Sequence, residues 1–256
     1  MKLEVKNVSK SFEEKQVLDQ VSIHLEEGEI VCLLGASGGG KTTLFNIISG
    51  LMSPDRGAVY MDGQEITGQP GRVSYMLQKD MLLPYKTVLD NVALPLMIKK
   101  QSGADRARLP LWKKQEARKE AASYFEEFGL DGYEKKYPSE MSGGMRQRAA
   151  LLRTYLFSDE VALLDEPFSA LDAITKNAMH QWYLSVMEKI HLSTLFITHD
   201  MDEAILLSDR IYILAGVPGQ IVEEIRIEQP KPRNRDFLLT EDFLQYKKRI
   251  RACLQE

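Results

Sequence analysis

Nine consecutive residues have the types and spacing of a phosphate-binding loop: Gly35, Ala36, Ser37, Gly38, Gly39, Gly40, Lys41, Thr42 and Thr43. They directly follow the apolar run 30–34, which predicts a strand that leads into the loop. The glycines let successive backbone N–H groups turn inward and form a concave anion site that side chains would obstruct. Lys41 can reach the outer phosphates and Thr42 can place its hydroxyl on Mg²⁺. A helix beginning near Lys41 would add its positive dipole end.

Two adjacent carboxylates, Asp165 and Glu166, follow a second predicted strand at 161–164. Because ligands of an open α/β sheet gather at the carboxyl ends of its strands, both should lie near the phosphate loop. Asp165 can hold Mg²⁺ or its hydration shell, and Glu166 can polarise a water for attack on a γ-phosphate. The pair therefore predicts metal-assisted phosphate hydrolysis.

Gln78 and His199 also stand at the ends of predicted strands, 73–77 and 194–198. Gln78 could reach the same metal and water through its amide oxygen, and His199 could hydrogen-bond the γ-phosphate. Taken singly, each is more often a structural polar residue than a ligand. Their shared position at strand ends favours a role in the site.

A second anion site is predicted where Ser142, Gly143 and Gly144 open a helix. A serine cap and two glycines offer backbone N–H donors at the positive end of that helix. One nucleotide does not need two such loops from the same chain. We therefore expect this loop to serve the nucleotide of a second copy.

The order of predicted elements indicates an α/β protein. The first 30 residues alternate short apolar strands with turns, which predicts an antiparallel β region. After residue 160 strands alternate with helices, which implies a mostly parallel sheet covered on both faces. From about 84 to 157 the pattern is helical, with a helix predicted at 116–128 and a polar connection at 101–109. A helical subdomain is thus inserted in the core.

The carboxyl-terminal part closes with a hairpin around Pro218 and Gly219 and a helix from about Glu241. Acidic residues begin this helix and basic residues fill its second half, which suits the helix dipole. We therefore expect one nucleotide-binding domain at 1–228, including the helical insert, and a helical extension at 229–256.

Composition excludes several classes of protein. The 256 residues are 44% hydrophobic and 27% charged, as in a soluble globular protein. Because no apolar run approaches the roughly 18 residues that span a bilayer and no signal-peptide core is present, we expect a cytosolic location. Cys32 and Cys253 lack metal-ligand spacing. The net charge of −4 argues against a large nucleic-acid-binding face.

Six motifs together resemble those of the ATP-binding subunits of ABC transporters. In chain order these are the Walker A loop at 35–43, the Q-loop at Gln78, the signature loop at 141–145, Walker B with its catalytic glutamate at 161–166, the D-loop at 169–172 and the switch histidine, His199. Phe12 falls where the family places an aromatic residue that stacks on adenine. The resemblance covers nearly the whole chain.

The resemblance implies a P-loop NTPase core of the RecA type that uses ATP and Mg²⁺. It also implies a head-to-tail dimer, in which each ATP lies between Lys41 of one copy and Ser142 of the other. A separate integral-membrane permease should dock near 82–85 and the helical insert, which places the protein at the cytoplasmic face of the membrane. An extracytoplasmic solute-binding protein would complete an importer, and no nucleic acid is expected as a partner.

Within the family, the segments 82–85, 88–92 and 232–236 resemble the importers of nitrate, sulfonates and taurine, a group that includes carriers of thiamine-precursor pyrimidines. Tyr85 stands where tryptophan is commoner, which weakens a sulfonate assignment. Two alternatives remain open: an exporter with a separate permease, and a non-transport ABC ATPase acting on DNA or ribosomes. Such non-transport proteins usually carry two cassettes or a long coiled coil, and 78–142 is too short for that arm.

Overall fold

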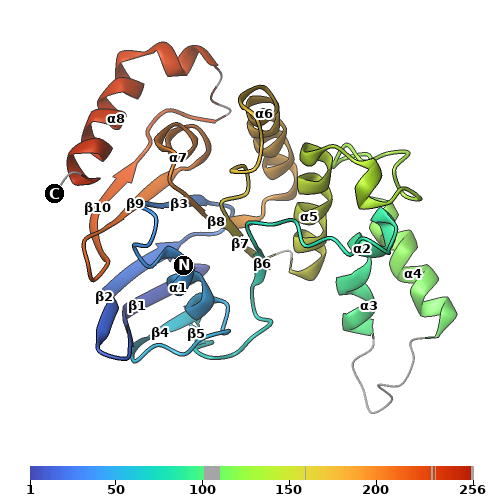
Figure 1. The fold of residues 1–256 in the computed structure, drawn as a ribbon, viewed down its shortest axis with the longest axis horizontal. Helices are drawn as coiled ribbons and strands as arrows, with labels where there is room; N and C mark the ends of the chain where they lie inside the picture. The colour runs from blue at the N-terminus through green and yellow to red at the C-terminus, as the bar shows by residue number, and fades with distance from the viewer. Residues whose placement is uncertain (101–109, 159, 232, 234, 255–256) are drawn as a thin grey trace.

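The computed structural model describes residues 1–100, 110–158, 160–231, 233 and 235–254, so the polar connection predicted at 101–109 lies outside it. The strands form two β-sheets (Figure 1). The six-stranded sheet has the order β10-β9-β3-β8-β7-β6, with bounds β3 Ile30–Gly35, β6 Ser74–Met76, β7 Val161–Asp165, β8 Ser193–Thr198, β9 Arg210–Ala215 and β10 Gln220–Arg226. All neighbours pair in parallel except β9 and β10, which form the predicted hairpin.

The second sheet is antiparallel and has the order β2-β1-β4-β5, with bounds β1 Leu3–Phe12, β2 Lys15–Leu25, β4 Arg56–Met61 and β5 Gln64–Glu65. It contains the antiparallel β region predicted for the first 30 residues. The helices are α1 Lys41–Ile48, α2 Val88–Val92, α3 Leu94–Lys100, α4 Leu111–Ala122, α5 Gly143–Phe157, α6 Ala173–Ile190, α7 Met201–Leu207 and α8 Glu241–Leu254. Two short 3₁₀ turns lie at Pro138–Glu140 and Arg235–Leu239.

Strands β3, β7, β8 and β9 of the six-stranded sheet are buried on both faces, as their continuous apolar sequences predict, whereas the edge strand β10 is largely exposed. In β3 the side chains of Cys32 and Leu34 join a core with α5, α6 and α7. The alternate residues Val31 and Leu33 join a second core with α1 and the antiparallel sheet. Helices therefore cover one face, and α1 with the second sheet covers the other. This leaves the strand ends as the places where polar groups can gather.

Helices α2 to α5 form a block on one side of the molecule, reached from β6 and left through α5 (Figure 1). The prediction of a helix at 116–128 is wrong in its bounds, because α4 covers Leu111–Ala122. Beyond it Tyr124 and Phe125 donate to the carbonyls three residues earlier, and Leu130 donates to the carbonyl of Phe125. These turns still bury Phe125 and Phe128. The apolar spacing identified the buried positions but not the conformation.

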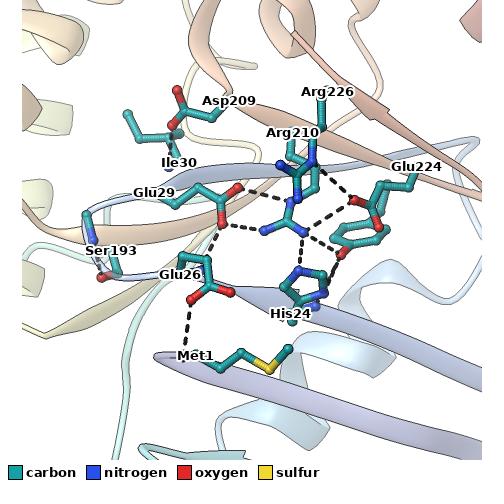
Figure 2. A network of polar contacts seen from close by, with 12 residues as sticks. Met1, His24, Glu26, Glu29, Ile30, Ser193, Asp209, Arg210, Glu224 and Arg226 are labelled. Carbon is teal, nitrogen blue, oxygen red and sulfur yellow. Dashed lines mark hydrogen bonds and ion pairs between the residues drawn. The ribbon is translucent and has the colours of Figure 1, made fainter. Parts of the chain in front are cut away.

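A dense polar network lies at the amino-terminal edge of the six-stranded sheet, where β3, β8 and β9 begin (Figure 2). Arg210, only 1% exposed, pairs with Glu29 at 2.5 Å and with Glu224 at 3.3 Å. Its guanidinium also contacts Nε2 of His24, and Nδ1 of that ring lies 2.9 Å from the Tyr212 hydroxyl. Burial raises the pKa of Tyr212 to about 12. The network joins both sheets.

Candidate active site

The phosphate loop connects β3 to α1 at the carboxyl-terminal edge of the sheet. Gly40 caps α1 in the left-handed conformation, with φ of 92°, and a Cβ there would meet the Leu18 side chain at 2.7 Å. Gly38 also has a positive φ, 82°, but a Cβ there would meet no atom within 4 Å. Backbone conformation therefore explains glycine at both positions.

Glycine is needed at position 35 for a different reason from the one that the sequence suggests. A Cβ at this position would lie 2.4 Å from the carbonyl oxygen of Leu214 on the neighbouring strand β9. The absence of a side chain thus allows close packing within the sheet rather than space for an anion. This is a correction to the expectation for the first glycine of the loop.

Lys41 is buried beneath the loop that precedes it. Its Nζ donates to the carbonyls of Gly35 at 2.8 Å and Ala36 at 2.7 Å. An ammonium group has three N–H donors, so one remains for an outside acceptor. Burial lowers the pKa of Lys41, opposed by the negative charges of Glu166 and Asp165. The lysine is therefore held by the chain at the place where phosphate oxygens are expected.

Asp165 ends β7 and faces the first turn of α1. Its Oδ2 accepts from the Thr42 hydroxyl at 3.5 Å and from the Tyr75 hydroxyl at 3.3 Å. Burial raises the pKa of Asp165, and the hydrogen bond from Tyr75 opposes that rise. The sequence reasoning did not identify Tyr75. One feature of the sequence could have pointed to Tyr75, because it lies in the short apolar strand that leads to Gln78.

Asp165 and Thr42 have the oxygen donors that Mg²⁺ prefers. No group of three His, Cys, Asp or Glu side chains that could hold a metal occurs in the described part of the chain. One carboxylate, Asp165, and one hydroxyl, Thr42, do meet at the phosphate loop. Mg²⁺ usually keeps several waters and binds one or two carboxylates together with substrate phosphates, so this sparse donor set fits it.

Glu166 is held between two polar residues from other strands. Its Oε2 accepts from the Gln78 amide at 3.1 Å, and its Oε1 lies 3.1 Å from Nδ1 of His199. The backbone is left-handed here, with φ of 46°, and its N–H donates to the Ile197 carbonyl on β8. Ser169 accepts a second hydrogen bond from Gln78 at 3.4 Å. Three strand ends thus bring together Glu166, Gln78 and His199, as their positions predict.

The contacts of Gln78 differ from the expectation that its amide oxygen reaches the metal. Within the described residues its side chain contacts Glu166 and Ser169, and no contact joins it to Thr42 or Asp165. Its expected role as a metal ligand therefore remains a prediction. The contact with Ser169 was not foreseen, although this serine lies in the loop that follows Glu166.

An open cleft of about 750 Å³ adjoins Glu166, and its lining includes Gln78, His199, Gly143 and Arg146. Ser142 caps α5 by accepting from the backbone N–H of Met145 at 3.3 Å. A Cβ on Gly143 would meet only side chains, the nearer at 3.6 Å. Packing within the chain therefore leaves room for a side chain at Gly143, whereas a Cβ on Gly144 would meet Thr175 at 3.3 Å.

The two predicted anion loops share no hydrogen bond in the part of the chain that the structure describes. In the described residues, none of the hydrogen bonds of Ser142, Gly143 or Gly144 reaches the phosphate loop at 35–43. Phe12, at the end of β1, is exposed, and its ring lies 5.8 Å from the Lys10 ammonium. Its expected stacking on adenine also remains a prediction.

A glycine loop between a parallel strand and a helix, beside carboxylates at strand ends, defines the class of P-loop nucleotide hydrolases. The family model described as ABC transporter matches residues 18–169. The chain belongs to this family, whose cassettes bind ATP, and it is an ABC ATPase.

Similar proteins support this assignment. The chain is 44% identical to the formylaminopyrimidine import ATP-binding protein ThiZ of Halalkalibacterium halodurans, over 94% of this chain and 90% of that protein. It is 36% identical to the nitrate import ATP-binding protein NrtD of a Synechocystis species, over 100% of this chain and 96% of that protein. A dimeric, post-hydrolysis structure of the ATP-binding cassette MJ0796 with ADP and Pi is 29% identical, with a TM-score of 0.70 over 89% of this chain and 100% of the other. The predicted α/β fold is confirmed.

Proposed function

We propose that two copies of this chain hydrolyse ATP at shared sites and thereby drive uptake of a small solute through a separate permease. The observation that carries the proposal is the position of Glu166, which is held between Gln78 and His199 beside the phosphate loop. The similarity to formylaminopyrimidine and nitrate import proteins supports import and this solute class.

On the nucleotide, the backbone N–H groups of the loop and the ammonium of Lys41 bind the phosphate oxygens. Lys41 is already held at the loop by two carbonyls, so little side-chain freedom is lost when its third N–H meets a phosphate. Thr43 continues the loop into α1, and Phe12 stacks on the adenine ring. These residues bind and orient the substrate.

In the hydrolytic step, a water oxygen forms a bond to the γ-phosphorus while the bond from that phosphorus to the bridging oxygen breaks. Glu166 accepts the proton of the attacking water, and ADP leaves with the electron pair of the broken bond. Gln78 and His199 hold the Glu166 carboxylate and orient the water and the γ-phosphate.

Bound Mg²⁺ would neutralise charge that develops on the β- and γ-phosphate oxygens. Thr42, Asp165 and Gln78 are the residues that would hold it. Because Asp165 is buried, its charge is poorly solvated by water and is available to a cation. Asp165→Asn is expected to weaken Mn²⁺ binding, measured by its paramagnetic resonance signal with a non-hydrolysable ATP analogue, while metal-free nucleotide binding is retained.

The second half of each site comes from the signature loop of the other copy, through Ser142, Gly143 and Gly144. The room beside Gly143 within its own chain and the dimeric structures of a similar cassette support this arrangement. A two-fold dimer gives both nucleotides equivalent sites, which explains two anion loops in one chain.

The permease docks on the segment at 82–85 and the neighbouring helical insert. Among the described residues no helix could cross a bilayer, and exposed apolar side chains occur on this side at Leu77, Met81 and Tyr85. The similarity to import ATP-binding proteins supports a place at the cytoplasmic face of the membrane, with a solute-binding protein on the other side. The nucleotide-binding domain is 1–228 with its insert at about 84–157, and 229–256 is an extension whose Phe243 and Ile250 pack into the main core.

The test is uptake by reconstituted vesicles that hold the cognate permease, the binding protein and this chain. Formylaminopyrimidine, nitrate and a sulfonate are offered in turn, with Glu166→Gln protein as the matched control. ATP-dependent accumulation of one of them by the wild type alone supports the proposal. ATP-dependent extrusion, or hydrolysis that no permease stimulates, would overturn it.

A further inference from the structure

A buried polar cluster joins α6 to the residues that flank His199. Lys176 on α6 lies 2.8 Å from Oδ2 of Asp200 and 2.5 Å from Oε1 of Glu203. Asp200 directly follows His199 and caps α7, because its Oδ1 accepts from the backbone N–H groups of Asp202 and Glu203. One lysine thus holds two of the three carboxylates in the segment after His199.

The cluster also holds the residue before His199. The Thr198 hydroxyl donates to Oε2 of Glu203 at 2.5 Å and accepts from the Asp200 backbone N–H at 3.0 Å. An aspartate followed three residues later by a glutamate is typical of a capping box, in which Glu203 would return to that same N–H. The structure corrects this, because Thr198 takes the N–H and Glu203 reaches Lys176 instead. Thr198 and Asp200, on both sides of His199, are therefore fixed to one group of side chains.

The charges of Lys176 and Glu203 stabilise the cluster. The Glu203 side chain is 3% exposed. Burial by itself would raise the pKa of Glu203, but contacts with His180, Lys176 and Thr198 outweigh it and lower the pKa. The pKa of Lys176 is raised by its hydrogen bonds to Asp200 and Glu203, which outweigh its burial. Each partner thus favours the charged form of the other, and an ion pair whose carboxylate also accepts from the Thr198 hydroxyl holds its geometry closely.

The same helix contacts the loop that follows Glu166. The His180 ring stands edge-on to Phe168, with ring centroids 4.9 Å apart, and its Nε2 lies 3.4 Å from Oε1 of Glu203. Phe168 is two residues beyond Glu166. Helix α6 therefore contacts both the segment after Glu166 and the residues around His199.

We propose that Lys176 and Glu203 are positioning residues, which set the distance between the His199 ring and Glu166. The ring itself is 56% exposed, and in the described residues its recorded side-chain contact is with Glu166 alone. Its orientation must therefore come from the backbone that Thr198 and Asp200 fix. This inference rests on the proposed function, since it requires that His199 acts in hydrolysis.

The first test is Lys176→Met. Because a misplacement of about 1 Å can slow a reaction about a hundredfold, kcat is expected to fall by about ten- to a hundredfold. The Kd for ATP should stay unchanged, since Lys176 touches no residue of the phosphate loop in the described contacts. Lys176→Arg, which keeps the charge and donors, should restore most of the rate.

Lys247→Met is the matched control. Lys247 lies on α8 and pairs at 2.6 Å with Asp202, which is on α7 like Glu203. Among the described interactions Lys247 contacts neither Thr198 nor Asp200. The Lys247→Met protein should hydrolyse ATP at the wild-type rate. If Lys247→Met slowed hydrolysis as much as Lys176→Met, loss of any α7 ion pair would suffice and the proposal would fall.

A double-mutant cycle separates this inference from the proposed function. If Lys176 acts through His199, then Lys176→Met adds no further loss of kcat to His199→Ala. If the double variant instead lost kcat by the product of the two single losses, or if Lys176→Met had the wild-type rate, the positioning role would be overturned while the role of His199 stayed intact. A wild-type rate for His199→Ala would instead remove His199 from the mechanism.

Glu203→Gln keeps the test decisive if Lys176→Met does not fold, because it preserves side-chain shape and removes only the charge. Folding is monitored by thermal unfolding of each variant. A folded Glu203→Gln protein with wild-type kcat would contradict the proposal, and one with reduced kcat and unchanged Kd for ATP supports it.

Discussion

The two edges of the six-stranded sheet both carry buried charge, but they use it differently. At the amino-terminal edge, Arg210 is surrounded by Glu29, Glu224, His24 and the Tyr212 hydroxyl (Figure 2). At the carboxyl-terminal edge, the described residues accept two hydrogen bonds from the Lys41 ammonium, which has three donors, and the Thr42 and His199 side chains are exposed. Strand β3 serves both edges, because Glu29 precedes it and the phosphate loop follows it.

The difference shows how to distinguish a structural polar network from a reactive one. A network whose groups satisfy each other stabilises the fold and has little left to offer a ligand. A network with donors and acceptors left over is less stable by itself and can bind or transform a substrate. Four substitutions test this contrast, from the largest expected effect to the smallest.

Glu166→Gln should reduce kcat for ATP hydrolysis by about 10²–10⁴-fold, the usual range for loss of a general base. Glutamine keeps the hydrogen bonds with Gln78 and His199 but cannot accept the proton of the attacking water. Phosphate release at saturating ATP measures the effect. Rapid hydrolysis by this variant would remove Glu166 from the mechanism.

Arg210→Met should lower the free energy of unfolding by about 3–5 kcal/mol, because it leaves Glu29 with no cation in a buried network. Chemical denaturation gives the value, and kcat per folded molecule should not change. Arg226→Met is the control, since Arg226 is 69% exposed and lies 3.9 Å from Glu224. A loss of kcat in folded Arg210→Met protein would show that the two edges are coupled.

Lys41→Ala should weaken ATP binding by about ten- to a hundredfold, the loss expected for one charge-assisted hydrogen bond. Titration calorimetry with a non-hydrolysable ATP analogue measures the Kd. Lys6→Ala, which removes an exposed ion pair with Glu4, serves as the control and should leave the Kd unchanged. Unchanged affinity in Lys41→Ala would contradict the assignment of the phosphate loop.

Asp165→Asn should raise the free energy of unfolding by about 1 kcal/mol without nucleotide, the opposite sign from Arg210→Met. Burial raises the pKa of Asp165, so the folded state holds its proton more tightly than the unfolded state. Stability of the wild type should therefore rise as pH falls from neutral through this raised pKa. Denaturation of the wild type and of Asp165→Asn at several pH values measures both effects. An Asp165→Asn protein that is less stable than the wild type at neutral pH would contradict the difference proposed between the two edges.

The sequence predicted the strand ends well because continuous apolar runs and turn residues mark buried parallel strands locally. It therefore located Asp165, Glu166 and His199 at one edge. It did not predict Tyr75 beside Asp165 or Lys176 beside Glu203, since such contacts depend on how distant elements pack. The helix at 116–128 was misplaced for a related reason, because burial of Phe125 and Phe128 is equally compatible with turns.

The central claim is that each ATP site needs the signature loop of a second copy. Sedimentation velocity of Glu166→Gln protein, with and without ATP, tests it most directly, because this variant should bind ATP and not hydrolyse it. We expect a monomer without ATP, a dimer with ATP, and an ATP-bound monomer when Ser142→Arg is added. A Glu166→Gln protein that binds ATP and stays monomeric, or a dimer that Ser142→Arg does not disturb, would contradict the shared site.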